Sequence, residues 1–312
     1  MHDQLRIFTG SGNPRLTRDI CDYLGLPLGR ANITRFSNEN IFVQIEENVR
    51  ERDCFVVQPL SSPVSENLVE LLIMLDALRS ASASRITAVI PYYSYARSDK
   101  KDMPRISVAA RLVADLLGTA GATRVLTMTL HSEQVQGFFS VPTDHLTATP
   151  IIARHFQEMG QEDFVAVAPD AGSARRAGAY ATRLGIPLAL VDKRRVNDQK
   201  VELRAVVGDV VGKSVIIFDD EIATGTSLLE TVNVLASVGV RAVYAGCTHG
   251  VLCGLAIGRI AASPLQQVVV TDTVPLAPEK RIDKITVLSV APLFGEAIKR
   301  IHTGESVSSL FV

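Results

Sequence analysis

VIIFDDEIATGTSLLET, residues 215–231, is the most informative stretch of this chain. It begins with four apolar residues, which are too few for a helix and unbroken enough for a buried parallel strand. Asp219 and Asp220 follow, where the predicted strand ends. The chain then turns through Thr224 to Ser227 and enters a helical pattern of apolar residues. The stretch therefore predicts a strand, a loop and a helix of an α/β protein.

The composition of this loop suits a sugar phosphate. A turn rich in glycine and hydroxyls at a helix start presents backbone N–H groups and hydroxyl donors to an anion. The adjacent carboxylates of Asp219 and Asp220 can hold sugar hydroxyls or a metal. We therefore predict that the acids contact the sugar and the loop contacts its phosphate. An ordinary polar turn between a strand and a helix has a similar composition, so this segment alone leaves both interpretations open.

The size and charge of the chain exclude several classes of protein. Its 312 residues suffice for two α/β domains, and 47% hydrophobic and 21% charged residues indicate a globular protein. A formal net charge of -1 gives no support to a nucleic-acid or anionic membrane surface. The longest apolar run, residues 242–258, is too short and too interrupted to span a membrane. We expect neither a nucleic-acid partner nor a membrane partner.

The four cysteines form no CxxC pair, and the start of the chain lacks the apolar core of a signal peptide. These features predict a reduced, cytoplasmic protein. Cys247, His249 and Cys253 lie close together in the sequence. A structural zinc site needs four ligands in paired spacing, so we expect buried structural cysteines here.

Strand and helix patterns alternate along the chain, and a second round of the alternation begins near Pro150. Such alternation predicts parallel sheets covered by helices on both faces, in two doubly wound units. The predicted strands are 5–9, 41–45, 55–57, 86–91, 125–130, 164–168, 188–191, 215–218, 242–247 and 267–271. The predicted helices include one that ends at Gly25, then 67–79, 108–117 closed by Gly118, 151–159, one from Ala174 and one in the tail.

Polar side chains recur where predicted strands end. They are His131, Asp170, Lys193, Asp219 and Asp220. In an open parallel sheet the carboxyl ends of the strands line the ligand crevice. Each residue alone has an ordinary structural explanation, but the repeated placement indicates a shared site. Imidazole, carboxylates and cations suit magnesium-dependent phosphate chemistry. In such chemistry the metal and the cationic side chains neutralise the negative charge of the phosphates in the transition state.

A charged segment follows the predicted strand 86–91. Three tyrosines precede it, and Arg97, Lys100 and Lys101 carry its positive charge. It is either a solvated loop or a mobile nucleotide-binding loop in which the cations face polyphosphate. Composition does not separate these two interpretations.

Motifs along essentially the whole chain resemble those of the ribose-phosphate pyrophosphokinase family. The matching stretches are RFS (35–37), NLVELLIMLDALR (67–79), YAR (95–97), HSEQVQGFF (131–139), VTDTVP (270–275), LSVAPL (288–293) and residues 304–311. The resemblance implies an α/β protein of two doubly wound parallel-sheet domains of the type I phosphoribosyltransferase fold. One domain would be residues 1–148 completed by the tail 291–312, and the other residues 149–290.

The resemblance also implies an activity, namely transfer of the diphosphoryl group of ATP to the C1 hydroxyl of ribose 5-phosphate. It implies magnesium at His131 and Asp170, with Lys193 and Arg195 as catalytic residues. The implied ribose 5-phosphate ligands are Arg195, Asp219, Asp220, Ala223, Thr224, Gly225, Thr226 and Ser227. The implied ATP ligands are Phe36, Asn38, Glu39, Asn40, Arg97, Ser98, Asp99 and Lys100.

Four positions depart from the family pattern. The phosphate loop carries Ala223 in place of an acid and Thr226 in place of a second glycine. In the ATP segments, Asn40 replaces a glutamate and Ser98 a glutamine. A cradle of backbone N–H groups does not itself require the acid. We therefore expect retained activity with altered ribose 5-phosphate affinity or nucleotide preference, and Glu221 is a candidate source of the missing charge.

The resemblance further implies a homohexamer with phosphate as activator and ADP as inhibitor. Candidate contacts for these anions are Arg50, Arg105, Ser306 and Ser308. Two alternatives compete with this interpretation. A non-catalytic regulatory homologue should have lost metal or lysine positions, whereas His131, Asp170 and Lys193 are present. A phosphoribosyltransferase that consumes the activated sugar explains residues 215–231 but gives the N-terminal half no role.

Overall fold

The computed structural model describes residues 4–160, 163–197 and 200–310, and of residues 193–197 and 200–204 it describes only the backbone. The chain forms two compact units. The N-terminal unit comprises residues 1–147, 273–275 and 289–312, and the C-terminal unit comprises residues 148–272 and 276–288. Both are α/β units with parallel sheets, as the sequence predicts.

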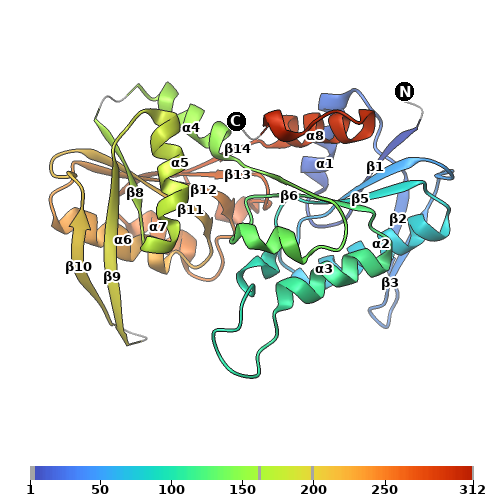
Figure 1. The fold of residues 1–312 in the computed structure, drawn as a ribbon, viewed down its shortest axis with the longest axis horizontal. Coiled ribbons are helices and arrows are strands. Elements are labelled where there is room, and N and C mark those ends of the chain that lie inside the picture. The colour runs from blue at the N-terminus through green and yellow to red at the C-terminus, as the bar shows by residue number, and fades with distance from the viewer. Residues whose placement is uncertain (1–3, 161–162, 198–199, 311–312) are drawn as a thin grey trace. The chain divides into compact units, whose positions relative to one another are not determined.

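The N-terminal unit is built on a parallel sheet of order β1-β4-β5-β6-β7 (Figure 1). Its strands are β1 (Leu5–Thr9), β4 (Asp53–Val57), β5 (Arg85–Ile90), β6 (Arg124–Met128) and β7 (Thr143–Leu146). Every residue of β4 is buried, which suits an unbroken apolar run in a sheet covered on both faces. A separate antiparallel hairpin joins β2 (Ala31–Arg35) to β3 (Ile41–Ile45).

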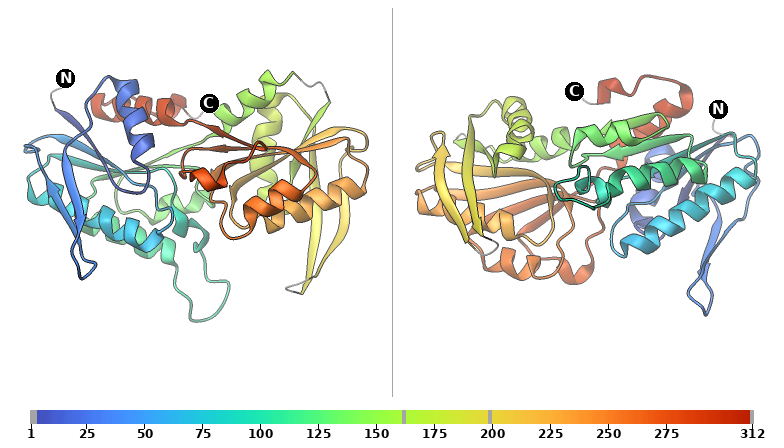
Figure 2. Two further views of the ribbon diagram at one scale, coloured as in Figure 1. Left: turned by 180° about the vertical axis from the view of Figure 1, so that it is seen from behind. Right: turned by 60° about the horizontal axis from the view of Figure 1, so that its bottom comes forward.

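Helices cover both faces of this sheet (Figures 1 and 2). Helices α1 (Pro14–Leu24) and α8 (Ala291–Thr303) pack together, as do α2 (Val64–Ser80) and α3 (Ala109–Ala120). The predicted end of α3 at Gly118 is wrong, because the helix continues to Ala120 and Gly121 is its C-cap. Gly121 has φ +119, in the left-handed region that favours glycine and ends helices. Gly118 lies inside the helix instead, where an added Cβ would stand 3.1 Å from Ser140 Oγ.

The C-terminal unit is built on a sheet of order β10-β9-β8-β11-β12-β13-β14. Strands β9 and β10 pair antiparallel, and the other neighbouring strands pair in parallel. Its strands are β8 (Phe164–Ala168), β9 (Leu188–Asn197), β10 (Lys200–Val207), β11 (Ser214–Ile222), β12 (Ala242–Gly250), β13 (Leu265–Thr271) and β14 (Ile285–Leu288).

Four helices flank this second sheet, two on each face (Figure 1). Helices α4 (Thr149–Glu158) and α5 (Ala174–Leu184) pack together on one face, and α6 (Thr226–Ser237) and α7 (Ala256–Ala262) on the other. Short 3-10 helices occur in both units. They are Ser94–Arg97, Glu133–Phe138, Ala171–Ser173, Pro278–Lys280 and Ser308–Leu310.

Strand β11 is longer than the apolar run predicts. The predicted end at Phe218 is wrong, because β12 pairs with β11 as far as Ile222 opposite Gly250. The pairing of β11 with β8 stops at Ile217 opposite Val167. Asp219 and Asp220 therefore lie within a strand, on a stretch that has a parallel neighbour on one side only.

Two other predicted strand ends are also wrong. Strand β9 does not end at Val191 but continues to Asn197, because β10 pairs with it in an antiparallel hairpin. Lys193 and Arg195 thus lie within a long strand, and the structure describes their backbone but not their side chains. Strand β6 ends at Met128, and Thr129 with φ +43 turns the chain before His131.

The cysteines correct a further expectation. Cys21, Cys54 and Cys247 are buried, but Cys253 is exposed. Cys253 lies in the turn after β12, where its backbone N–H donates to the carbonyl of Ala223, 2.9 Å away. Over the described residues, the helices are all too short or too polar to cross a membrane.

Candidate functional site

The predicted phosphate loop lies between β11 and α6 in the C-terminal unit. Gly225 stands at the start of the 12-residue helix α6 with φ +73, a conformation that a side chain would strain. The exposed residues Thr226 and Ser227 belong to the first turn of α6 and not, as predicted, to the preceding turn. The first turn of a helix has backbone N–H groups without intrahelical partners and the positive end of the helix dipole. The loop is therefore suited to an anion.

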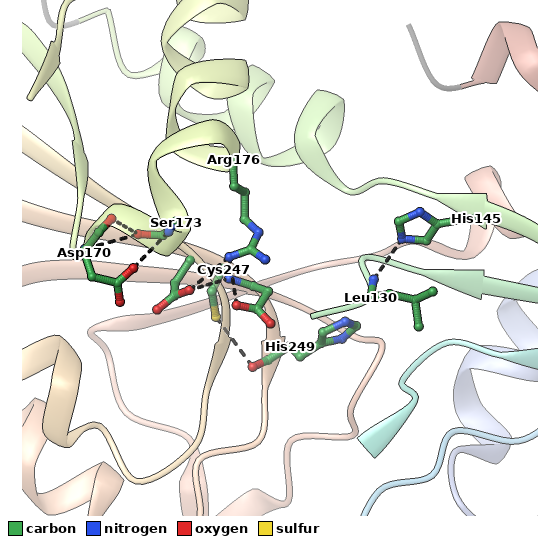
Figure 3. A network of polar contacts seen from close by, with 9 residues as sticks. Leu130, His145, Asp170, Ser173, Arg176, Cys247 and His249 are labelled. Atoms are coloured by element: carbon green, nitrogen blue, oxygen red, sulfur yellow. Dashed lines mark hydrogen bonds and ion pairs between the residues drawn. The ribbon is translucent and has the colours of Figure 1, made fainter. Parts of the chain in front are cut away.

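Arg176 of α5 holds the two acids that precede the loop (Figure 3). Its Nη1 lies 2.9 Å from Oδ1 of Asp220 and 3.2 Å from Oδ1 of Asp219. The backbone N–H of Asp220 also donates to Oδ1 of Asp219, over 2.9 Å. The side chain of Asp220 is 5% exposed and that of Asp219 is 32% exposed. Asp219 is thus the member of the pair that can more readily reach a ligand.

The sheet fixes the position of Arg176 through an aromatic stack. Tyr180, one turn further along α5, lies flat on Phe218 with ring centroids 3.9 Å apart and ring planes 3° apart. Both side chains are fully buried. Because residues four apart lie on one face of a helix, the stack places Arg176 over the residues that follow Phe218.

The acid pair carries an unusual charge state. Burial, and then the neighbouring charge of Asp220, raises the pKa of the Asp219 carboxyl, and Arg176 opposes this rise. Arg176 contributes one positive charge beside two neighbouring carboxylates, which favours the protonated form of Asp219. Burial likewise raises the pKa of the neighbouring Cys247 thiol well above its ordinary value, so this cysteine is not a reactive thiolate.

The raised pKa of Asp219 makes stability depend on pH. The native state binds this proton more tightly than the unfolded chain, so ionisation of Asp219 removes stability as the pH rises above about 4. We expect Asp219→Asn to match the wild type in stability near pH 4 and to exceed it by at least about 1 kcal/mol at pH 8. Urea unfolding of both proteins across this range measures the difference. A difference that stays constant with pH would contradict the assignment.

Asp170 follows β8, the strand next to β11. The chain leaves β8 toward β9 on one side and returns as β11 on the other, so Asp170 and the acid pair border a topological switch point, where α/β sheets bind ligands. Asp170 Oδ1 accepts from the backbone N–H of Ser173 at 2.9 Å and caps the short helix that follows (Figure 3). Among the described contacts, the other carboxylate oxygen of this exposed residue has no partner.

The donor set is compatible with magnesium. In the described ranges no three His, Cys, Asp or Glu side chains gather to hold a metal ion. Mg²⁺ is commonly held by one or two protein carboxylates, with substrate phosphates and water completing the octahedron. Asp170, with one exposed carboxylate oxygen, fits this mode. His131, the second predicted ligand, is exposed and belongs to the N-terminal unit.

His145 of β7 fixes the backbone next to His131. Its Nε2 accepts from the N–H of Leu130 over 2.8 Å (Figure 3), and its Nδ1 lies 3.2 Å from Nε2 of Gln136. Burial lowers the pKa of His145 to about 4, which keeps the ring neutral and able to accept this bond at neutral pH.

The predicted ATP residues occupy two places in the N-terminal unit. The first is the exposed turn of the β2–β3 hairpin, which contains Phe36, Asn38, Glu39 and Asn40. Glu39 has φ +69, and the ring of Phe36, 55% exposed, tilts against Phe42 at 5.6 Å. An aromatic ring at an exposed hairpin turn is available for stacking on a planar ligand.

The second place is the segment after β5, with Arg97, Ser98, Asp99 and Lys100. Tyr92 and Tyr93 are buried beneath it, and the Tyr93 hydroxyl donates to the carbonyl of Ala110 over 2.9 Å. The carbonyl of Ser98 accepts from the N–H of Ala110 at 3.2 Å, which closes the base of the loop. The cationic residues Arg97, Lys100 and Lys101 are exposed. This geometry suits a ligand-binding loop, and the nucleotide remains a prediction.

The predicted regulatory residues are all exposed. Arg50 donates its N–H to Asn48 Oδ1 at 3.0 Å, and Arg105 has φ +66. The N–H of Ser308 donates to Ser306 Oγ at 3.3 Å, and Arg300 donates to the carbonyl of Ser306 at 3.1 Å. The roles of these four residues remain predictions.

Sequence reasoning missed two arginines of the C-terminal unit. Arg176 lies on a helix that follows Asp170, and its acidic partners come more than 40 residues later. Arg259 of α7 donates to the phosphate loop, at 2.9 Å to the carbonyl of Thr224 and 2.8 Å to Thr226 Oγ1. Arg176 lies six residues after Asp170, and this proximity to a predicted site residue could have identified it. No local sequence motif marks Arg259.

Comparison with known proteins identifies the family. The family model for the N-terminal domain of ribose phosphate pyrophosphokinase matches residues 5–121. The family model for the phosphoribosyl synthetase-associated domain matches residues 195–312.

Relatives match over nearly the whole chain. A ribose-phosphate pyrophosphokinase of Deinococcus radiodurans is 55% identical, with 98% of each chain covered. One of Caldanaerobacter subterraneus is 50% identical, with 99% of this chain and 98% of the relative covered. The crystal structure of phosphoribosylpyrophosphate synthetase from Mycobacterium smegmatis superposes with a TM-score of 0.91 at 40% identity, covering 96% of this chain and 99% of that chain. This chain belongs to the ribose-phosphate pyrophosphokinase family, and its fold is the one that the sequence resemblance implies.

Proposed function

We propose that this chain transfers the diphosphoryl group of ATP to the C1 hydroxyl of ribose 5-phosphate, giving 5-phosphoribosyl 1-diphosphate and AMP, for nucleotide biosynthesis. The observation that carries the proposal is the whole-chain similarity to proteins named ribose-phosphate pyrophosphokinase. The geometry of the C-terminal unit supports it, because a phosphate-binding helix start follows a pair of acids within one segment.

The substrate sugar binds along β11 and the loop after it. Its 5-phosphate lies at the start of α6, on the backbone and hydroxyls of residues 223–227, and its ring hydroxyls donate to Asp219 and Asp220. Arg176 orients these carboxylates, because its Nη1 bonds both of them. The arrangement fixes the sugar at two ends and thereby positions its C1 hydroxyl for attack.

In the reaction, the C1 oxygen forms a bond to the β-phosphorus of ATP while the bond from that phosphorus to the oxygen of the α-phosphate breaks. AMP leaves with the electron pair, and the hydroxyl loses its proton. Lys193 and Arg195 are the proposed cations that neutralise charge in the transition state. Their roles rest on the family resemblance, since only their backbone in β9 is described.

Magnesium is the proposed cofactor, held by Asp170 and His131, and it supplies neutralisation of the phosphate oxygens when bound. Phe36, Asn38, Glu39, Asn40 and the Arg97–Lys100 segment are the proposed ATP contacts. The substitutions Asn40, Ser98, Ala223 and Thr226 are proposed to change substrate affinity without abolishing activity.

Regulation and assembly are proposed on the same resemblance. The chain would form a homohexamer in the cytoplasm, with phosphate activating it and ADP inhibiting it through Arg50, Arg105, Ser306 and Ser308. Sedimentation gives the oligomer, and rate measurements at saturating ATP separate effector action from competition. An ADP effect that vanishes at saturating ATP, with no effect of phosphate, would remove the regulatory proposal.

The activity is tested by AMP formation from ATP and Mg²⁺, with and without ribose 5-phosphate. We expect AMP only when the sugar is present. A folded, assembled protein that forms no AMP would overturn the proposal and favour a non-catalytic regulatory homologue.

A further inference from the structure

Arg259 lies directly behind the phosphate loop. It belongs to α7, which packs beside α6 on one face of the C-terminal sheet (Figure 1). Its Nη1 donates to the backbone carbonyl of Thr224 at 2.9 Å and to Thr226 Oγ1 at 2.8 Å. Among the described residues, Arg259 forms no ion pair with a carboxylate. Its guanidinium is directed at the loop through these two hydrogen bonds.

The loop hydroxyls continue this contact as a chain. Thr226 Oγ1 lies 3.1 Å from Thr224 Oγ1. Because a guanidinium can only donate, Thr226 Oγ1 accepts from Arg259, and either hydroxyl can donate in its contact with Thr224 Oγ1. When Thr226 donates to Thr224, the hydroxyl hydrogen of Thr224 is available to a ligand oxygen. In such a chain each bond polarises the next, so the last donor is strengthened by the charge at the first.

We propose that Arg259 is a positioning residue for the phosphate of ribose 5-phosphate, acting through Thr226 and Thr224. By donating to the Thr224 carbonyl, Arg259 keeps that oxygen from accepting the loop N–H groups that would bind the phosphate. By donating to Thr226 Oγ1, it orients the two hydroxyls so that they can donate to the phosphate. The proposal rests on the proposed function. It also gives Thr226 a use that a glycine at this position does not have, since glycine has no hydroxyl to accept from Arg259.

Binding of ribose 5-phosphate without ATP, measured by calorimetry, tests the proposal. Arg259→Ala should weaken binding about tenfold, the effect of one lost charge-assisted bond. Arg259→Lys should weaken ribose 5-phosphate binding less, because its ammonium keeps the positive charge but lacks the several N–H donors of the guanidinium. In turnover, KM for the sugar should rise while KM for ATP stays within about twofold. The matched control is Arg241→Ala, which removes an exposed arginine paired with Asp163, and should bind as the wild type does.

A pair of variants at position 226 separates positioning from simple support of the loop. Thr226→Ser keeps the hydroxyl, and Thr226→Val removes it at similar volume. Arg259→Ala should lower the affinity for ribose 5-phosphate about tenfold in the serine background and about threefold or less in the valine background. In the valine background the hydrogen bond between Arg259 and residue 226 is already absent. Thermal unfolding of each variant shows that it is folded.

The outcomes are distinct from failure of the proposed function. If the wild type binds ribose 5-phosphate in an Arg259-dependent way but forms no AMP, the inference stands and the activity falls. If Arg259→Ala and Arg259→Lys both bind within twofold of the wild type, the inference is overturned. It is also overturned if the loss is equal in the serine and valine backgrounds, or if the folded wild type does not bind the sugar.

Discussion

Arg176→Met is expected to destabilise the protein by about 3 kcal/mol at pH 8 and to weaken ribose 5-phosphate binding by at least an order of magnitude. The substitution leaves Asp219 and Asp220 facing each other without their shared cation, while it keeps the apolar length of the side chain. Breaking a buried ion pair from one side typically costs about 3–5 kcal/mol. We expect the lower end because the Asp219 side chain is 32% exposed.

Urea unfolding at pH 8 and pH 5 measures this effect. The loss of stability in Arg176→Met should be smaller at pH 5, where protonation of Asp219 relieves its repulsion with Asp220. Arg183→Met, on an exposed position of the same helix, should unfold as the wild type does. Adding Asp220→Asn to Arg176→Met should recover part of the lost stability. An Arg176→Met protein with wild-type stability at pH 8 would show that the guanidinium does not hold the acid pair.

Lys193→Ala is expected to lower kcat by at least about a thousandfold, because charge neutralisation is the main contribution of a protein to phosphoryl transfer. Ribose 5-phosphate binding should change only a few-fold, since the phosphate loop and the acid pair are untouched. AMP formation at saturating substrates, beside calorimetry of sugar binding, separates the two quantities. Lys213→Ala removes a lysine paired with Asp209 elsewhere in the unit and should retain full activity. A kcat that falls less than tenfold would exclude Lys193 from the chemistry.

The phosphate loop was predictable because its parts are contiguous in the sequence. A buried apolar run, two acids, a glycine and a helical pattern occupy residues 215–235, and each gives a local signal. The same reasoning located most other strands, such as β1 and β8, whose bounds match the predicted ones. Local composition was sufficient for these two strands.

The remainder depended on contacts between distant segments. Strand β9 extends through the charged residues 192–195 because β10 pairs with it, and no apolar pattern marks that extension. The end of β11 is set by β12, whose residues lie nearly 30 positions further along the chain. Arg259 meets the phosphate loop from a helix more than 30 residues away. Side-chain geometry of this kind follows from the packing of the sheet and its helices, which sequence periodicity does not encode.

The product of the reaction is the most direct test of the proposed activity. The protein is incubated with ATP, Mg²⁺ and ribose 5-phosphate, and the products are identified by phosphorus NMR. Diphosphoryl transfer predicts AMP in equal amount with a sugar that carries an intact diphosphate on C1 and a monophosphate on C5. ADP with a singly phosphorylated C1, or inorganic diphosphate with AMP and unchanged sugar, would contradict it.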